Sequence, residues 1–321
     1  MAGNVSKNRI SLLLTLLIVI SYYHTIHYPF FFDDAPNITG NINLPADTFS
    51  EIDFKKNFFQ SDGGISLRPL SYLSFALNWV ISGKETWSYH LVNILIHIVS
   101  ALVLLKTILL LFQTPVGRKK STNDECVVFV AVIATVLWAL NPVQTQAVTY
   151  IVQRMASLAG MFCVISICFY LKARIGFSKF SKINVSLFCL STVFFLAGFF
   201  SKENAAILPL LILLIEFIFF ESFKNKKYIF FGAAVLIFIF LFAELFSGRD
   251  IIQKIVQGYD DRPFNVYERI LTEFRILFFY LTQLFYPIPQ RLSLLHSIDI
   301  SKSIFDPIAT FLCMLLFVFS L

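Results

Sequence analysis

The sequence predicts an all-α protein that crosses a membrane several times. Of its 321 residues, 57% are hydrophobic and only 14% are charged, and the mean hydropathy is +0.74. A soluble domain has roughly 25% charged residues. Apolar runs of about 20 residues recur along the chain, which is the length that a helix needs to cross a bilayer. Because these runs are continuous and not alternating, and because lipid cannot satisfy backbone polar groups, we expect transmembrane helices.

About nine transmembrane helices are predicted. In chain order their ranges are 10–32, 90–112, 126–142, 148–171, 184–200, 204–222, 228–246, 268–288 and 306–321. The first is interpreted as a membrane anchor because no small-residue cleavage site follows it. The segment 268–288 contains Glu273 and Arg275. A re-entrant or interfacial helix is therefore the alternative there, and it would reverse the orientation of everything that follows.

The charges of the connecting loops predict the orientation. Basic residues gather at the N-terminus and in alternate connections, around 118–120, 172–182 and 224–227. The positive-inside rule places these connections in the cytoplasm. The loops outside the cytoplasm are then about 33–89 and 247–267, together with the turns near 143–147 and 201–204. Within the first of these loops, the apolar stretch 67–81 is too short to span and predicts an interfacial helix.

The same charge pattern argues against a nucleic-acid partner, because the net charge of +6 comes from short loops between apolar segments. The five cysteines lie in or beside apolar runs without metal-ligand spacing, so we interpret them as small buried hydrophobic residues. The sequence contains no phosphate-binding loop, nucleotide fingerprint or zinc signature, which disfavours a soluble nucleotide donor. No cofactor is required by the sequence, although a divalent cation would be compatible with it.

Two adjacent carboxylates, Asp33 and Asp34, follow the first predicted span. Mutual repulsion tends to raise the pKa of one member of such a pair, which suits a general base for an acceptor hydroxyl. The alternative is an ordinary solvated loop start. Both residues are candidate catalytic groups.

Further polar residues fall on the same predicted side of the membrane, where ionisable groups are costly unless they have a role. The candidates for binding a substrate phosphate or sugar are Arg68, His90, Gln144, Arg154, Lys202 and Glu203. Arg154 lies in an apolar context and needs an anion, which Asp33, Asp34 or a ligand phosphate could supply. Lys202 and Glu203 could instead neutralise each other. His90, with Asn93 and His97 on one helix face, could instead form interhelical hydrogen bonds.

A carboxylate beside cations at a membrane surface suits a phosphate-bearing amphiphile, because cations hold the phosphate while a carboxylate activates the nucleophile. At these residues the chain resembles the transmembrane half of the transmembrane-and-tetratricopeptide-repeat (TMTC) family, which is related to protein O-mannosyltransferases. The resemblance extends from Ile10 to about Leu292. It rests on FFFDDAPNI (30–38), RPLSYLSFALN (68–78), YHLVNILIHI (89–98), ALNPVQTQAVTYIVQRMASLAGMF (139–162) and SKENAAILPLLILLIE (201–216).

This resemblance implies a C-type glycosyltransferase fold over residues 1–321. It also implies a polyprenyl- or dolichyl-phosphate sugar donor, usually of mannose, and a hydroxyl acceptor on a protein or glycan. Asp33 would be the base and Asp34 a supporting or sugar-binding residue, while Arg68, Arg154 and Lys202 would hold the donor phosphate. A lipid-binding groove is expected at about 228–267. Because the family's repeats are missing and the chain ends at Leu321 within an apolar run, we expect a fragment of a longer protein.

Two other function classes fit the composition. A lipid-carrier flippase or transporter would place its polar site near the bilayer midplane, within repeated halves. A non-catalytic membrane scaffold would use the same charges as structural ion pairs. Abundant Phe, Ile, Lys and Asn favour a bacterial inner membrane, with the site on its periplasmic face, over the endoplasmic reticulum.

Overall fold

The computed structural model describes residues 2–46, 48–52, 68–120, 123–176, 182–220, 258–260 and 262–320. Within these ranges all regular structure is helical and no strand occurs. The predicted all-α class is therefore confirmed for the described part of the chain. The chain divides into two compact units, Met1–Ala233 and Ala234–Leu321, which are treated separately.

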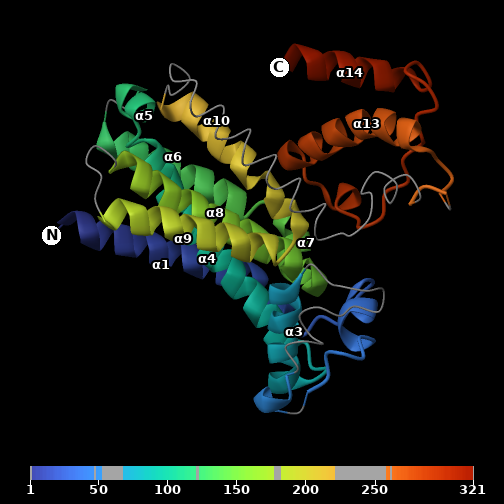
Figure 1. Cartoon of the computed structure of the whole chain (residues 1–321), viewed down its shortest axis with the longest axis horizontal. Coiled ribbons are helices and arrows are strands. Elements are labelled where there is room, and N and C mark those ends of the chain that lie inside the picture. The colour runs from blue at the N-terminus through green and yellow to red at the C-terminus, as the bar shows by residue number, and fades with distance from the viewer. Residues whose placement is uncertain are drawn as a thin grey trace. The chain divides into compact units, whose positions relative to one another are not determined.

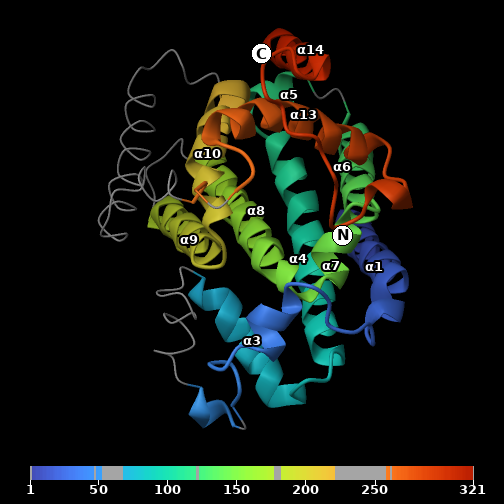
Figure 2. The ribbon, with the colours of Figure 1, turned by 90° about the vertical axis from the view of Figure 1, so that its right-hand side faces the viewer.

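The first unit is a bundle of helices. Its α-helices are α1 (Ala2–Tyr22), α3 (Pro69–Ser82), α4 (Trp87–Leu111), α5 (Pro115–Lys120), α6 (Asp124–Ala139), α7 (Gln144–Thr149), α8 (Arg154–Ile175), α9 (Lys182–Phe199) and α10 (Leu208–Phe220). Five short helical turns connect them: η1 (Tyr23–Thr25), η2 (Ala35–Thr39), η3 (Phe49–Glu51), η4 (Ile151–Gln153) and η5 (Glu203–Ile207). Helix α4 packs against α1, α6 and α8, and α8 also packs against α9. In Figures 1 and 2, α3 lies at one end of this bundle and α5 at the other.

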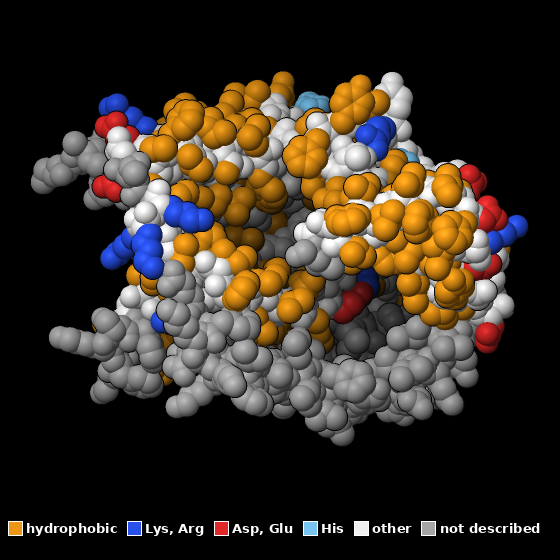
Figure 3. Space-filling model, turned by 90° about the horizontal axis from the view of Figure 1, so that it is seen from above, with side chains coloured by type: hydrophobic (Ala, Val, Ile, Leu, Met, Phe, Trp, Pro, Cys, Tyr) orange, Lys and Arg blue, Asp and Glu red, His pale blue; other side chains and the backbone are white. Residues whose placement is uncertain are grey.

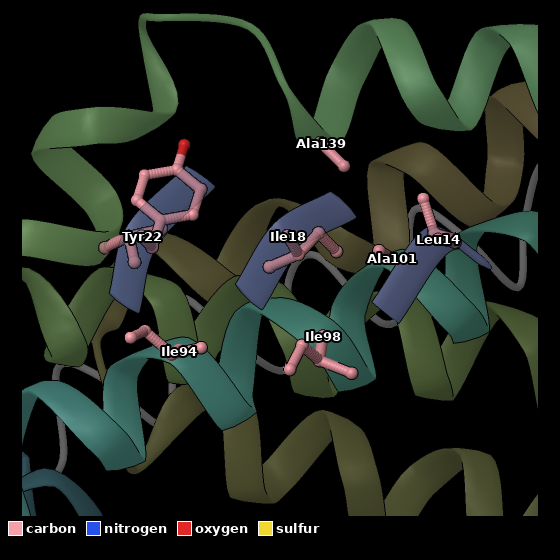
Figure 4. Close-up of a cluster of buried hydrophobic side chains, with 8 residues drawn as sticks. Leu14, Ile18, Tyr22, Ile94, Ile98, Ala101 and Ala139 are labelled. Carbon is pink, nitrogen blue, oxygen red and sulfur yellow. The ribbon is translucent and has the colours of Figure 1, made fainter. Parts of the chain in front are cut away.

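Helical spacing explains how α1 and α4 meet. A buried apolar cluster joins them, and Figure 4 shows its side chains along the neighbouring ribbons of α1 and α4, with Ala139 nearby. Its members are Leu14, Ile18 and Tyr22 of α1, Ile94, Ile98 and Ala101 of α4, and Ala139 and Val148. Positions three or four apart share one helix face. Because lipid is as apolar as these side chains, close packing and not the hydrophobic effect stabilises such a contact in a membrane.

Three described helices are long and apolar enough to cross a membrane: Trp87–Leu111, Ile151–Ile175 and Glu203–Phe220. Ile183–Phe199 and Ile308–Ser320 are apolar but shorter. Figure 3 shows a face on which hydrophobic side chains cover broad areas of the described surface. These features are those of an integral membrane protein. The nine-span topology stays a prediction, and its segment 228–246 lies outside the described residues.

Two predicted boundaries are wrong. Helix α1 ends at Tyr22 and not at residue 32, because the chain turns through η1, where the Thr25 hydroxyl donates to the Tyr22 carbonyl at 2.7 Å. The predicted helix 148–171 is interrupted as well. The backbone at Tyr150 is extended, so α7 and η4 precede a separate α8, and α7 occupies much of the predicted tight turn.

An asparagine on the neighbouring helix explains why this interruption is tolerated. The side-chain amide of Asn93 donates to the carbonyl oxygens of Val148 and Ile151, at 3.2 and 3.5 Å. These carbonyls flank the break in the helix. Buried backbone groups that leave a helix need such partners. Apolar continuity in the sequence cannot reveal a break that a distant side chain satisfies.

In the second unit, α13 (Val266–Phe285) and α14 (Ile308–Ser320) pack together, with η7 (Pro289–Arg291) between them in the chain. The Asn265 side chain accepts from the Glu268 N–H and the Glu268 carboxylate accepts from the Asn265 N–H, each at 2.9 Å. This capping box fixes the start of α13. Both helices agree with the predicted segments 268–288 and 306–321.

Candidate functional site

The α3 end of the first unit gathers three segments that are far apart in sequence. The Leu70 N–H donates to the Phe200 carbonyl at 3.1 Å, and the Ser71 hydroxyl donates to the Ser201 carbonyl at 2.8 Å. At the next residue, the Tyr72 hydroxyl donates to Asn37 Oδ1 at 3.0 Å. Helix α3 is thus bonded both to the loop after α1 and to the turn before η5.

Asp34 is buried and acts as a bridge between the loop after α1 and the start of η4. Its side chain is only 1% exposed. Oδ1 accepts from the Val152 N–H at 2.7 Å and Oδ2 accepts from the Phe31 N–H at 2.9 Å. Burial, assisted by the neighbouring charge of Asp33, raises the pKa of the Asp34 carboxyl, although the two N–H bonds oppose this. The direction agrees with the prediction for one member of the pair, but burial and not repulsion is the largest cause.

In contrast to Asp34, Asp33 has an exposed side chain, and hydrogen bonds fix its backbone. Its N–H donates to the Tyr150 hydroxyl at 2.8 Å, and its carbonyl accepts from Asn37 Nδ2 at 2.8 Å. The preceding residue, Phe32, has a φ of 50°, in the left-handed region that non-glycine residues rarely adopt. Strained residues of this kind are maintained only where surrounding contacts fix them. The turn presents the Asp33 carboxylate to solvent on a fixed backbone.

Arg154 begins α8 and is completely buried, with 0% of its surface exposed. Nε donates to Asn93 Oδ1 at 2.7 Å and Nη2 donates to the Tyr89 carbonyl at 2.8 Å. Nη1 donates to Asn78 Oδ1 at 2.5 Å and to the Ser74 carbonyl at 3.1 Å. One guanidinium therefore joins α3, α4 and α8.

These contacts revise what the sequence suggested for Arg154. Every direct hydrogen-bond partner of its guanidinium among the described residues is a neutral oxygen, and the Phe75 ring lies 4.7 Å from its central carbon. Asp34 influences it electrostatically without a hydrogen bond or an ion pair. The expected anionic partner in direct contact is replaced by a shell of amide, hydroxyl and carbonyl oxygens. In this structure Arg154 holds helices together and has no open side for a phosphate.

A second group of charges consists of Arg68, Lys202 and Glu203. The Arg68 guanidinium donates to both carboxylate oxygens of Glu203, at 2.8 and 2.5 Å, and Nη1 contacts Met155 Sδ at 3.5 Å. The bond to Glu203 raises the pKa of Arg68. Burial, with repulsion from Arg68, lowers the pKa of the Lys202 ammonium. The pairing of Glu203 is thus with Arg68 more than with its sequence neighbour.

This pair remains accessible to a ligand. The side chains of Arg68 and Glu203 are 34% and 47% exposed. Tyr72 follows Arg68 by one helical turn and acts on it electrostatically, while its hydroxyl bonds Asn37, which in turn bonds the Asp33 carbonyl. Tyr72 of α3, through Asn37, therefore connects the exposed cation Arg68 with the exposed acid Asp33.

His90 and Gln144 do not join these groups through side-chain bonds. His90 is fully buried in α4, and its Nε2 lies 3.0 Å from the Tyr28 carbonyl, which requires a proton on Nε2. Among the described residues, its Nδ1 has no hydrogen-bond partner. Gln144 begins α7, is half-buried, and its N–H donates to the Asn141 carbonyl at 2.9 Å. Within the described ranges, no bond joins the Gln144 side chain to another candidate.

Two alternatives from the sequence are supported for the neighbours of His90. Nε2 of His97 bonds the Ala139 carbonyl at 2.9 Å, and its ring stacks on Trp138 with centroids 5.1 Å apart. Asn93 bonds Arg154 and the α7–η4 corner. Both side chains serve interhelical hydrogen bonding.

Tyr72, Asn78 and Tyr150 were not predicted as site residues from the sequence. A signal existed for α3, since its polar residues at 71, 74 and 78 recur every three or four positions and predict one polar helix face. No comparable signal marks Tyr150, because its partner Asp33 lies 117 residues away.

No group of three His, Cys, Asp or Glu side chains that could hold a metal ion occurs among the described residues. The described apolar cavities, of about 450 and 180 Å³, lie beside Ile10 of α1 and Val132 of α6, away from Asp33 and Arg68. Most of the predicted lipid groove at 228–267, namely 228–257 and 261, lies outside the described residues.

Comparison with known proteins supports the resemblance seen in the sequence. The chain is 28% identical over 177 residues to human protein O-mannosyl-transferase TMTC3, which is 54% of this chain and 18% of that protein. It is 34% identical over 166 residues to protein O-mannosyl-transferase tmtc2 of Xenopus laevis, covering 50% of this chain and 18% of that protein. It is 29% identical over 221 residues to protein O-mannosyl-transferase F38B6.6 of Caenorhabditis elegans, covering 67% and 29% respectively.

The TMTC resemblance is confirmed over about half of the chain, while the chain spans under a third of the length of these relatives. No protein-family profile matches the chain. No solved structure matches it significantly.

Proposed function

We propose that this membrane protein is a glycosyltransferase of the O-mannosyltransferase type. It moves a sugar, most simply mannose, from a polyprenyl- or dolichyl-phosphate donor to a hydroxyl on a protein or glycan, at the non-cytoplasmic face. The similarity to proteins named protein O-mannosyl-transferases supports the transferase class. The observation that carries the proposal is the exposed Asp33 carboxylate on a fixed backbone, at the bundle end that also holds Arg68 and Lys202.

In this proposal Asp33 is the general base. The acceptor hydroxyl gives its proton to the Asp33 carboxylate while its oxygen forms a bond to the anomeric carbon. The bond from that carbon to the phosphate oxygen breaks, and the lipid phosphate leaves with the electron pair. A single displacement of this kind inverts the anomeric centre, as in inverting glycosidases with one base opposite one leaving group. A positioned base of this type contributes roughly 10²–10⁴-fold to the rate.

The cations of the site bind the donor phosphate. Arg68 and Lys202 together carry two positive charges, and the single carboxylate of Glu203 neutralises one of them. A phosphate that approaches this group therefore finds a net positive charge. The Arg68 side chain is 34% exposed, and an arginine binds phosphate more strongly than a neutral donor because its hydrogen bonds are charge-assisted. We expect Arg68 and Lys202 to contribute more to catalysis by stabilising the negative charge of the leaving phosphate than Asp33 contributes as the base.

Asp34, Arg154 and His90 serve the site indirectly. Asp34 ties the Asp33 turn to η4, and Arg154 ties η4 and α8 to α3 and α4. His90 bonds the Tyr28 carbonyl, in the segment that leads to the acidic pair. Gln144 begins α7 and is half-buried, and in this proposal its side-chain amide binds a hydroxyl of the donor sugar.

The proposed reaction does not depend on whether the protein lies in a bacterial inner membrane or in the endoplasmic reticulum. The named relatives are eukaryotic, so they lend no support to the bacterial inner membrane that the composition favours. The proposed chemistry is the same in either membrane, because both contain polyprenol-type phosphate carriers facing a non-cytoplasmic space.

The decisive experiment measures transfer of radiolabelled mannose from polyprenyl-phosphate mannose in vesicles that contain the full-length protein. Asp33→Asn should reduce transfer by at least about 100-fold, because it removes the base and keeps the side-chain shape. Glu85→Gln is the matched control. Glu85 is an exposed acid on the α3–α4 connection at the same bundle end, so its substitution should leave transfer unchanged.

Retention of full transfer by a folded Asp33→Asn protein would exclude Asp33 as the base. Absence of transfer from any polyprenyl-phosphate sugar, together with movement of the intact carrier across the vesicle membrane, would instead identify a flippase. If the full-length protein shows neither sugar transfer nor carrier movement, the scaffold function is the one that remains.

The orientation is tested independently with single cysteines at Glu85 and Lys119, which lie near opposite ends of the bundle. A membrane-impermeant thiol reagent should label Glu85→Cys from the non-cytoplasmic side and Lys119→Cys only after the membrane is permeabilised. Equal labelling of both from one side would contradict the proposed topology.

A further inference from the structure

Tyr150 occupies the break between α7 and η4, with an extended backbone at φ −84° and ψ 108°. The residue is 7% exposed. Its hydroxyl reaches across the bundle end and accepts the Asp33 N–H at 2.8 Å. A continuous helix through this region would carry the side chain elsewhere, so the break is what brings the hydroxyl to Asp33.

The same hydroxyl also interacts with the Asp33 carboxylate. A phenol oxygen that accepts from a backbone N–H keeps its own proton, which it can donate. Because Asp33 supplies both the N–H and an acceptor carboxylate, Tyr150 can fix the backbone and the side chain of one residue together.

The rest of the turn is immobilised on both sides of Asp33. Phe32 has its left-handed φ of 50°, and the Asp34 carboxylate accepts from the Phe31 and Val152 N–H groups. The Asp33 carbonyl is held by Asn37. With the backbone fixed in this way, the remaining freedom of Asp33 is rotation of its exposed side chain, and a hydrogen bond from the Tyr150 hydroxyl to the carboxylate would remove that freedom.

We propose that Tyr150 is the positioning residue of this site: its hydroxyl holds the Asp33 carboxylate in the orientation that takes the proton from the acceptor hydroxyl. This inference rests on the proposed function of Asp33 as the base. Tyr150 itself exchanges no proton with the substrate. A base held within hydrogen-bonding reach of its proton in the correct orientation is more effective than a freely rotating one.

The test compares Tyr150→Phe with Tyr170→Phe in the full-length protein in vesicles. The Tyr170 hydroxyl donates to the Glu216 carboxylate, so the control removes an equivalent phenol–carboxylate bond between α8 and α10. Tyr150→Phe should lower kcat for mannose transfer about tenfold or more without changing KM for the polyprenyl-phosphate donor. Tyr170→Phe should change neither.

A double-mutant cycle separates positioning from general stability. If Tyr150 acts through Asp33, adding Tyr150→Phe to Asp33→Asn should cause no further loss of kcat. Independent, additive losses would overturn the inference. A normal kcat for Tyr150→Phe would also overturn it while leaving Asp33 as the base, provided that Asp33→Asn shows its expected loss of transfer. Full wild-type activity in Asp33→Asn would instead contradict the proposed function itself.

If Tyr150→Phe fails to fold, 3-fluorotyrosine at position 150 gives the second measurement, because it keeps the ring and the hydroxyl. Fluorination makes the phenol a stronger hydrogen-bond donor, which favours the ionised carboxylate of its partner. The acidic limb of the kcat–pH profile should therefore move to lower pH. An unmoved profile would show that Tyr150 does not act on the base.

Discussion

Replacing Arg154 tests the central structural element of the bundle end. Arg154→Met keeps most of the side-chain volume and removes both the charge and the five N–H donors. Five oxygens lose a donor: two amide oxygens, of Asn78 and Asn93, two backbone carbonyls, of Ser74 and Tyr89, and the Ser74 hydroxyl.

The size of the effect follows from which oxygens remain unpaired. The carbonyls of Ser74 and Tyr89 lie within α3 and α4, where a helical N–H can still reach them. The oxygens of Asn78 and Asn93 lose their only described donor, and a buried unsatisfied oxygen costs about 1–3 kcal/mol. Taking about 1.5 kcal/mol for each gives an expected destabilisation of about 3 kcal/mol.

Arg154→Lys should be no better than Arg154→Met. A lysine retains the buried positive charge but offers three donors from one point, and these cannot reach acceptors on both sides of a planar guanidinium site. A charge left with an incomplete shell of partners is strongly unfavourable in the interior. Comparing Arg154→Lys with Arg154→Met therefore separates the contribution of the charge to stability from the contribution of the hydrogen-bonding geometry.

The assay is reversible unfolding of the full chain in mixed micelles, titrated with SDS and followed by circular dichroism. Arg118→Met is the control, because Arg118 lies on the exposed surface of α5 and surface changes usually stay within about 0.5 kcal/mol. The reasoning is refuted if both Arg154 variants lie within about 0.5 kcal/mol of the wild-type free energy of unfolding. It is also refuted if the lysine variant retains full stability while the methionine variant does not, because the charge alone would then suffice.

Two further predictions concern the acids and cations of the site. The pKa of Asp34 is raised in the folded protein, so protonation favours the folded state. The stability of wild type relative to Asp34→Asn should then increase as pH falls from 8 towards 4, by at most about 1.4 kcal/mol per pH unit, and a decrease measured by thermal unfolding would contradict this. For the cations, Arg68→Met should weaken donor binding about tenfold through loss of charge-assisted bonds, measured as KM for polyprenyl-phosphate mannose. Glu203→Gln, which releases Arg68 from its partner, should leave KM unchanged or lower it, and an increase equal to that of Arg68→Met would refute the assignment of the phosphate to Arg68.

Several helices could be predicted from hydropathy because the bilayer imposes their length. The predicted segments 90–112, 126–142 and 184–200 differ from α4, α6 and α9 by two or three residues at most. The errors occurred where polar backbone groups found partners outside their own helix. Near 148–153 the partner is Asn93, and no residue within that segment predicts this contact.

Of the candidate site, the sequence supplied the residue types and the end of the bundle on which they gather. Alternation of basic and non-basic connections was enough to group 33–34, 144, 154 and 202–203 at one end, because consecutive spanning helices run in opposite directions. The sequence could not predict which of these residues pair with one another. Glu203 could pair equally well with Lys202 or with Arg68, and only the position of α3 against the turn before η5 selects Arg68.

The sequence by itself determined that this is a helical membrane protein with acids and cations near one end of its bundle, because lipid forces backbone groups to be satisfied within helices and charges to lie at their ends. The tertiary structure decided which acid is exposed and which is buried. Asp34 is covered because Val152, 118 positions away, brings its N–H to the carboxylate, whereas the Asp33 N–H donates to the Tyr150 hydroxyl and the Asp33 side chain stays exposed. Neighbours in sequence differ here because burial depends on which distant helices pack over each side chain, and that packing is a property of the folded chain as a whole.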